Sequence, residues 1–288
     1  MFNGKLHGLT AACAAAAFAV GGAAGGAAWA DPDDHELVID GESIVTEVAA
    51  QPGNPLGTLY SGWRYRTPET QALQMDDFEN PVMLQVDLAR DVWSVAEGEA
   101  GKSCASCHDD VEVSMIGVKA GYPKMNAGAG KAFALEHQVN ACRTERMGAD
   151  AWKWESQDMI GMTALIGLQS RGMPVDIDDD ALAPVIAQGK DIYNTRFGQL
   201  DLSCANCHED NNGVMIRADH LSQGHGNGFP TYRLKWQGTG TLHRRFKGCM
   251  DNIRAEPYKR GSEEFTALEA YIAWRGQGLS VETPSVRN

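Results

Sequence analysis

Two five-residue segments place a pair of cysteines directly before a histidine. They are CASCH, ending at His108, and CANCH, ending at His208. In a C-x-x-C-H motif two thiols three residues apart can form thioethers with the two vinyl groups of one haem, and the histidine is held against the iron as proximal ligand. Zinc sites and dithiol redox sites also use C-x-x-C, but two copies that both end in histidine favour two covalently bound haem c groups. The expected attachment residues are Cys104, Cys107, Cys204 and Cys207, with His108 and His208 as proximal ligands.

Two further cysteines, Cys142 and Cys249, occupy equivalent points of an internal repeat. LEHQVNAC ends at Cys142 and LHRRFKGC ends at Cys249, 107 residues later. A disulfide between them would require equivalent points of two neighbouring domains to approach within about 7 Å. We therefore expect each cysteine to be the distal axial ligand of its own haem, where a thiolate lowers the reduction potential of the iron. The competing distal ligands are Met115, Met125, Met215, His137, His220 and His225.

The elements that must position these ligands also occur twice. Cys104 and Cys204 are 100 residues apart, and Ser156–Val175 aligns with Ser262–Val281 at an offset of 106. Each copy is predicted to contain a helix, a haem motif, a long loop, a cysteine and a closing helix. In the second copy an apolar spacing from Phe265 to Leu279 predicts one buried helix face. AQGKDIY, Ala187–Tyr193, and LEAYIAW resemble the opening and closing helices of class I cytochromes c.

This pattern predicts a mainly α protein of two tandem class I cytochrome c-like domains related by duplication. We expect a signal peptide at 1–30, an N-terminal extension packed on the first domain at 31–90, and the first domain at 91–175. The acidic, proline-containing stretch 176–184 is predicted to be a solvated linker, and 185–288 the second, catalytic domain.

Export is predicted from the first thirty residues. An Ala- and Gly-rich run ends in Ala28-Trp29-Ala30, which has the small-x-small form of a cleavage site, so cleavage is expected after Ala30 and the protein is expected in the periplasm. The chain has 38 acidic against 25 basic residues and a net charge of −13. This charge argues against nucleic acid and anionic membrane as partners.

The two copies differ most in charge around the distal cysteine. His243, Arg244, Arg245 and Lys247 precede Cys249, whereas the aligned residues before Cys142 are close to neutral. Cationic neighbours favour a thiolate and form a site for a small anion. Arg245 lies four residues before Cys249, hence on the same helix face, and a guanidinium can hold an oxyanion by paired hydrogen bonds. A solvated basic face or contact with haem propionates are the alternatives.

The residues therefore suggest a thiosulfate-like dianion brought to a sulfur that can carry a persulfide. At this point the chain resembles the SoxA family of dihaem cytochromes. The resemblance includes QMDDFENP within Ser61–Pro81, both C-x-x-C-H motifs, Cys142, and the Arg245 to Cys249 spacing. It covers nearly all of the expected mature chain.

The resemblance implies an L-cysteine S-thiosulfotransferase that works with a SoxX-type monohaem cytochrome c as a heterodimer. It implies oxidative coupling of thiosulfate to a cysteine of a SoxYZ-type carrier protein, with electrons passed to an acceptor cytochrome c. Cys249 would be distal ligand and catalytic persulfide carrier, and Arg245 would bind substrate. A thiosulfate dehydrogenase that forms tetrathionate and a plain electron-transfer dihaem cytochrome remain as alternatives.

Overall fold

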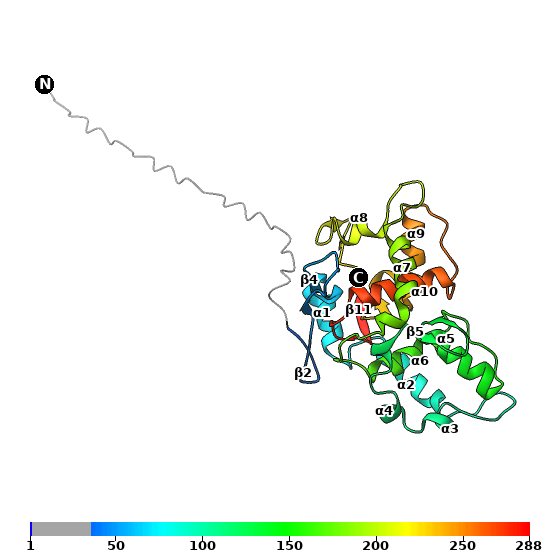
Figure 1. Cartoon of the computed structure of the whole chain (residues 1–288). Helices are drawn as coiled ribbons and strands as arrows, with labels where there is room; N and C mark the ends of the chain where they lie inside the picture. Colours follow the sequence, from blue (N-terminus) through cyan, green and yellow to red (C-terminus); the bar gives the residue numbers. More distant parts are fainter. Residues whose placement is uncertain (2–35) are drawn as a thin grey trace.

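The computed structural model describes Met1 and residues 36–288, which form two helical repeats side by side with a small β-rich extension against one of them (Figure 1). The expected signal peptide and the cleavage site after Ala30 lie outside the described residues. Within 36–288, no helix combines the length and apolar character needed to cross a membrane.

The first repeat is built from short helices around an apolar core. It comprises α2 (Met83–Trp93), α3 (Ala105–His108), α4 (Val111–Ser114), η2 (Lys119–Gly121), the hairpin β5 (Lys124–Asn126) and β6 (Lys131–Phe133), α5 (Leu135–Ala141), the π-helical turn η3 (Cys142–Met147) and α6 (Gln157–Leu168). Helix α6 begins where the Ser156 side chain accepts a hydrogen bond from the Met159 N–H, which satisfies a free amide of the first turn.

The second repeat follows the same plan. It comprises α7 (Asp179–Asn194), α8 (Cys204–His208), β7 (Met215–Ile216), β8 (Asp219–His220), β9 (Thr231–Arg233), η4 (Leu234–Trp236), β10 (Gly238–Gly240), α9 (Leu242–Asn252) and α10 (Glu263–Arg275). Ser262 caps α10 as Ser156 caps α6. The structure thus confirms the predicted duplication and the mainly helical class.

In each repeat the opening helix crosses the closing helix at one tight point: α2 crosses α6, and α7 crosses α10. A Cβ atom on Gly189 of α7 would lie 1.9 Å from the carbonyl oxygen of Ala267 on α10. In the first repeat the glycine is on the other helix, because a Cβ on Gly161 of α6 would lie 2.8 Å from the carbonyl oxygen of Gln85 and 3.2 Å from the Cβ of Ala89, both on α2. At the repeat offsets Ala89 matches Gly189 and Gly161 matches Ala267, so the two repeats place the required glycine on opposite helices.

The N-terminal extension packs mainly on the second repeat, whereas the sequence predicted packing on the first, which it also contacts through the pairing of Asp77 and Asp40 with Arg171. It contains β1 (Leu37–Ile39), β2 (Glu42–Ile44), β3 (Glu47–Ala49), β4 (Thr58–Tyr60), η1 (Gly62–Tyr65) and α1 (Pro68–Met75). The Tyr60 N–H donates to Oε1 of Gln223, 2.7 Å away, and Arg66 pairs with Asp219. Residues 83–90 do not belong to the extension, because α2, which begins at Met83, is the opening helix of the first repeat.

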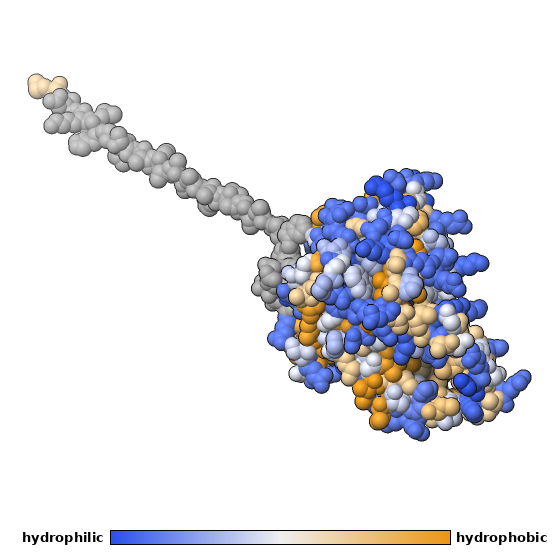
Figure 2. All heavy atoms as spheres, in the orientation of Figure 1, coloured by the Kyte–Doolittle hydropathy of each residue, from blue (hydrophilic) through white to orange (hydrophobic). Residues whose placement is uncertain are grey.

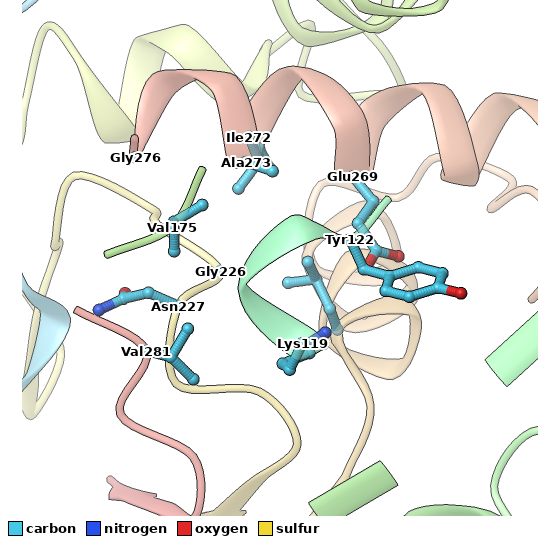
Figure 3. A pocket seen from close by; sticks show the side chains of 11 residues that line it. Lys119, Tyr122, Val175, Gly226, Asn227, Glu269, Ile272, Ala273, Gly276 and Val281 are labelled. Carbon is cyan, nitrogen blue, oxygen red and sulfur yellow. The ribbon is translucent and has the colours of Figure 1, made fainter. Parts of the chain in front are cut away.

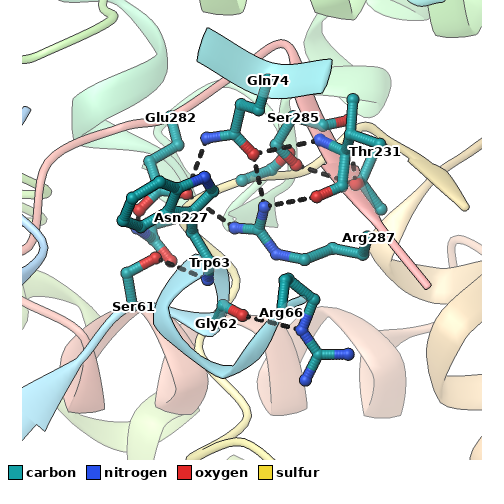
Figure 4. A network of polar contacts seen from close by, with 12 residues as sticks. Ser61, Gly62, Trp63, Arg66, Gln74, Asn227, Thr231, Glu282, Ser285 and Arg287 are labelled. Atoms are coloured by element: carbon teal, nitrogen blue, oxygen red, sulfur yellow. Dashed lines mark hydrogen bonds and ion pairs between the residues drawn. The ribbon is translucent and has the colours of Figure 1, made fainter. Parts of the chain in front are cut away.

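The C-terminal tail is held between the extension and the second repeat. Its strand β11 (Ser285–Arg287) runs parallel to β9 in the sheet β10-β9-β11. Figure 4 shows Arg287 reaching Gln74 of α1 and Glu282, with distances of 2.5 and 2.6 Å. Glu282 is fully buried and also accepts from Asn227. The two ends of the described chain therefore close on each other through buried polar contacts.

Two further sequence predictions need correction. Helix α7 begins at Asp179 and contains Pro184, and Ile177 is buried, so 176–184 is mostly the start of a helix rather than a solvated linker. Helix α10 is buried on every side from Phe265 to Ile272 rather than on one face, because the first repeat covers the side that α7 leaves open. The outer surface seen in Figure 2 is mainly hydrophilic, with scattered apolar side chains.

Candidate active site

The proximal histidine of the second repeat is held in one tautomer. Helix α8 starts with a capping box in which Ser203 and Asn206 satisfy each other's backbone N–H groups. At its end, Nδ1 of His208 lies 2.7 Å from the Ser222 carbonyl oxygen, so Nδ1 carries the proton and donates it. Nε2 is then left with a free lone pair, as a metal ligand requires. A Cβ on Gly224 would lie 2.8 Å from Cγ of His208, so this loop lies flat against the ring.

Helix α9 brings Cys249 and Arg245 to the same site. The Thr241 side chain caps the helix by accepting from the Arg244 N–H, and Arg245 and Cys249 lie one turn apart on it. Burial would raise the pKa of the Cys249 thiol, but Arg245 foremost, and then the neighbouring His208 and Arg233, lower that pKa to about 6. Burial raises the pKa of Cys204 to about 12. Cys249 is therefore the thiolate of this group, as expected for a ligand or a nucleophile.

Only Arg245 of the predicted basic cluster acts on Cys249. The Arg244 guanidinium stacks over Trp236, 4.4 Å from the ring centroid, and Lys247 pairs with Asp251 at 2.7 Å on the surface. His243 is 1% exposed and faces Glu269 in the interior. Arg244, Lys247 and His243 therefore lie away from the thiol, because successive helix positions point in different directions.

A second basic residue near Cys249, Arg233, was not predicted from the sequence. Arg233 of β9 interacts electrostatically with both Arg245 and Cys249. Asp219 of β8 accepts from Arg66, Arg233 and Lys235, so it fixes Arg233 and partly neutralises the cluster. A comparison of the two repeats could have identified Arg233, because it aligns with the neutral Asn126 at an offset of 107.

The distal cysteine of the first repeat has a neutral neighbour in place of Arg245. Cys142 ends α5 and opens the π-helical turn η3. Gln138, which aligns with Arg245, places Nε2 3.4 Å from Sγ of Cys142. Cys104 and Tyr122 both interact electrostatically with Cys142, so α3, α5 and the loop after η2 meet there. His108 is exposed at the end of α3. The assignment of His108 and Cys142 to opposite sides of the first haem stays a prediction.

The alternative distal ligands are placed less favourably. Met115 is buried in the apolar core of the first repeat, whereas Met125 and Met215 are exposed on β5 and β7. Both ring nitrogens of His137 are hydrogen-bonded, to Ala134 and Gly261. His225 places Nε2 3.0 Å from Oε1 of Gln223, and burial lowers its pKa to about 3.

Two tandem cytochrome c domains, each with its own C-x-x-C-H motif, define a dihaem c-type cytochrome. The family model for the SoxA/TsdA cytochrome c domain matches residues 88–175 and 188–281. The chain belongs to the SoxA family, as the sequence resemblance predicted.

Relatives match over nearly their whole length. The L-cysteine S-thiosulfotransferase subunit SoxA of Paracoccus pantotrophus is 51% identical over 95% of this chain and 96% of its own. The SoxA subunit of Pseudaminobacter salicylatoxidans is 50% identical over 90% of this chain and 91% of its own. A chain of the crystal structure of SoxXA from P. pantotrophus superposes with a TM-score of 0.85 at 52% identity, covering 90% of this chain and all of that one.

Proposed function

We propose that this chain is the catalytic subunit of an L-cysteine S-thiosulfotransferase, which joins thiosulfate to a cysteine of a SoxYZ-type carrier protein. The balanced reaction takes thiosulfate dianion and a carrier thiol to a cysteine S-thiosulfonate, one proton and two electrons. The observation that carries the proposal is the contrast between the repeats: Arg245 stands beside the thiolate of Cys249, where the first repeat has Gln138 beside Cys142.

The residues of both repeats fit covalent haem c. We assign Cys104, Cys107, His108 and Cys142 to the first haem, and Cys204, Cys207, His208 and Cys249 to the second. The fit is best supported in the second repeat, where the Ser222 carbonyl fixes the tautomer of His208 and Cys249 is a thiolate. When bound, haem supplies a one-electron acceptor next to the sulfur chemistry.

Arg245 and Cys249 divide the substrate work between them. The guanidinium of Arg245 binds sulfonate oxygens of thiosulfate by paired hydrogen bonds, which orients the sulfane sulfur toward Sγ of Cys249. In this proposal Cys249 itself bears a persulfide, whose outer sulfur is separate from the thiosulfate, so both sulfur atoms of thiosulfate end on the carrier cysteine. Arg233 is held in place by its ion pair with Asp219. Its positive charge attracts the thiosulfate dianion to the site.

The proposed assembly has three further components. A SoxX-type monohaem cytochrome c would form the heterodimer, by analogy with the similar SoxXA protein of P. pantotrophus. A SoxYZ-type carrier would present its cysteine at the Arg245 side, and an acceptor cytochrome c would remove the electrons. The predicted location of this assembly is the periplasm, after cleavage behind Ala30.

Reconstitution tests this function directly. The purified heterodimer, carrier, thiosulfate and an oxidised cytochrome c are mixed, and the mass of the carrier is measured. An increase corresponding to one thiosulfonate, only with acceptor present, is expected. Free tetrathionate without modified carrier would instead support a thiosulfate dehydrogenase, and no reaction with thiosulfate would support a plain electron-transfer cytochrome.

Two variants and one control assign the roles. Cys249→Ala should abolish turnover while both haems stay covalently attached, because Cys204 and Cys207 are untouched. Arg245→Gln, which copies the first repeat, should lower kcat/KM on the order of 10²-fold, because charge-assisted hydrogen bonds contribute about 1.5–3 kcal/mol each. Arg244→Gln is the matched control, since Arg244 stacks on Trp236, and it should retain activity. Substantial turnover by Cys249→Ala would remove the persulfide role.

A further inference from the structure

A group of titratable side chains is buried where the two repeats meet. Glu136 on α5 is 6% exposed, Glu269 on α10 is 5% exposed, and His243 on α9 is 1% exposed. Lys119 of η2 adds a positive charge facing both carboxyl groups. We call these four residues the interdomain cluster. None of them belongs to a haem motif, and the sulfur chemistry proposed above makes no use of them.

Hydrogen bonds fix the protonation of the histidines at this interface. His243 accepts from the Gly261 N–H through Nδ1 at 3.0 Å, so that nitrogen carries no proton and the ring is the neutral Nε2–H tautomer. His137 accepts from the Ala134 N–H through Nδ1 at 3.1 Å and donates from Nε2 to the Gly261 carbonyl oxygen at 3.0 Å. Neither ring can therefore hold a second proton without breaking a backbone hydrogen bond.

The two carboxyl groups differ in their partners. Oε2 of Glu269 lies 3.0 Å from Nε2 of His243, although the ring N–H is poorly aligned with it. Oε2 of Glu136 is buried and lacks a hydrogen-bond partner among the described residues. Burial foremost, and then the charge of Glu269, raise the pKa of Glu136. For Glu269 burial is outweighed by His243, which lowers its pKa. An unpartnered buried carboxylate costs several kcal/mol, so Glu136 rather than Glu269 is the carboxyl group of the pair that takes up a proton.

The cluster reaches toward the distal side of the first haem. Lys119, Tyr122 and Glu269 line a cavity of about 30 Å³ between the repeats, and Figure 3 shows the Tyr122 ring beside the Glu269 carboxylate. Tyr122 also interacts electrostatically with Cys142. Glu136 lies six residues before Cys142 on the same helical run, about 9 Å of rise. His243 stands in the same relation to Cys249, since Glu136 and His243 are equivalent positions of the duplication.

We propose that the Glu136–Glu269 pair is a redox-linked proton site. It binds a proton when an electron enters the protein and releases that proton when the electron leaves. The electron adds negative charge within about two helix turns of the pair, and a proton that binds the Glu136 carboxylate compensates this charge. The electron comes from the proposed sulfur chemistry or from any reductant, so the proton site stands whichever substrate the second repeat oxidises.

The groups that face the pair cannot take this role themselves. These charged or titratable groups are Lys119 of η2, His137 of α5 and His243 of α9. Lys131 of β6 acts on His137. Both histidines are locked as neutral rings. Helix α6, which also packs on α5, contributes no charged side chain from Met159 to Leu168. A carboxyl group is thus the titrating group of the interface.

The test is a potentiometric titration of the dihaem protein in its cytochrome complex from pH 5 to pH 9. In the wild type, the midpoint potential of one haem should fall as pH rises, because reduction is coupled to proton uptake. Each tenfold fall in proton concentration shifts the reduction equilibrium by up to tenfold, which corresponds to about 59 mV for one electron. Glu136→Gln mimics the protonated acid permanently. Its midpoint should stay constant over the same window, at the value the wild type has at low pH.

Glu145→Gln is the matched control. Glu145 is only three residues past Cys142 but is exposed, so the same loss of charge should leave the pH dependence unchanged. A pH-independent wild-type midpoint, a slope that persists in Glu136→Gln, or a slope lost equally in Glu145→Gln would each overturn the proposal. The infrared difference spectrum between oxidised and reduced wild-type protein should also contain a protonated-carboxyl band. Its absence refutes the proposal even if Glu136→Gln does not fold.

Discussion

Asp219→Asn should destabilise the protein strongly, because one carboxylate balances two buried guanidinium groups. Asp219 bridges the extension and the second repeat by accepting from Arg66, from Arg233 at 3.4 Å and from Lys235 at 3.0 Å. The side chains of Arg66 and Arg233 are 4% and 7% exposed. Removing one partner of a buried ion pair costs about 3–5 kcal/mol, since it leaves an uncompensated buried charge. With two buried guanidinium groups affected, we expect a loss at the upper end of this range.

The pH dependence of this loss has a definite sign. Burial raises the pKa of Asp219, but Arg66 and Lys235 outweigh it and hold the pKa below its usual 3.8. A carboxyl group with a depressed pKa stabilises the folded state above its unfolded pKa, about 3.9, and that stability is lost as pH falls through the folded pKa. The difference between wild type and Asp219→Asn should therefore be constant above about pH 5 and should shrink below pH 4.

Urea denaturation followed by circular dichroism at pH 7, 5 and 3.5 measures both effects. The matched control is Asp251→Asn, which breaks the exposed Lys247 pair on α9. That change should cost no more than about 0.5 kcal/mol, as for other surface pairs. If Asp219→Asn costs as little as the control at pH 7, the buried-charge argument is refuted. A difference that grows below pH 4 would contradict the sign of the linkage.

Two other predictions concern the helix crossing and the first haem. Gly189→Ala should cost about 3 kcal/mol or more, because its Cβ would overlap the Ala267 backbone carbonyl; a loss below about 1 kcal/mol in thermal melts would contradict this close approach. Cys142→Met should change the visible spectrum and raise the midpoint potential of the first haem, because a thioether donates less charge than a thiolate; an unchanged spectrum would remove Cys142 as its ligand.

Local spacing was enough to predict the haem motifs, the duplication and the pairing of Arg245 with Cys249. Each of these features depends on residues within one helical turn or on a repeat that can be recognised in the amino-acid sequence. The capping serines of α6 and α10, for example, appear at the start of both aligned closing segments.

Long-range packing could not be predicted in the same way. The extension contacts residues more than 150 positions away, such as Asp219 and Gln223, and its own sequence has no periodicity that names a partner. His243 was misplaced because a basic residue beside a cysteine has the same pattern whether it faces the site or the interior. Glu136 was missed because a single acidic residue in a mixed helix gives no sign of burial.

The glycine exchange between the repeats also bears on how a duplicated chain avoids misfolding. Tandem copies of one fold can mispair during folding, because each opening helix meets two similar closing helices. If α2 packed on α10, the Cβ of Ala89 would meet the Ala267 carbonyl oxygen, where the native α7 has Gly189. If α7 packed on α6, the methyl group of Ala89 would be missing beside Gly161. Only the native pairs combine one methyl group with one glycine. The exchanged position of the glycine thus favours packing of each opening helix on the closing helix of its own repeat.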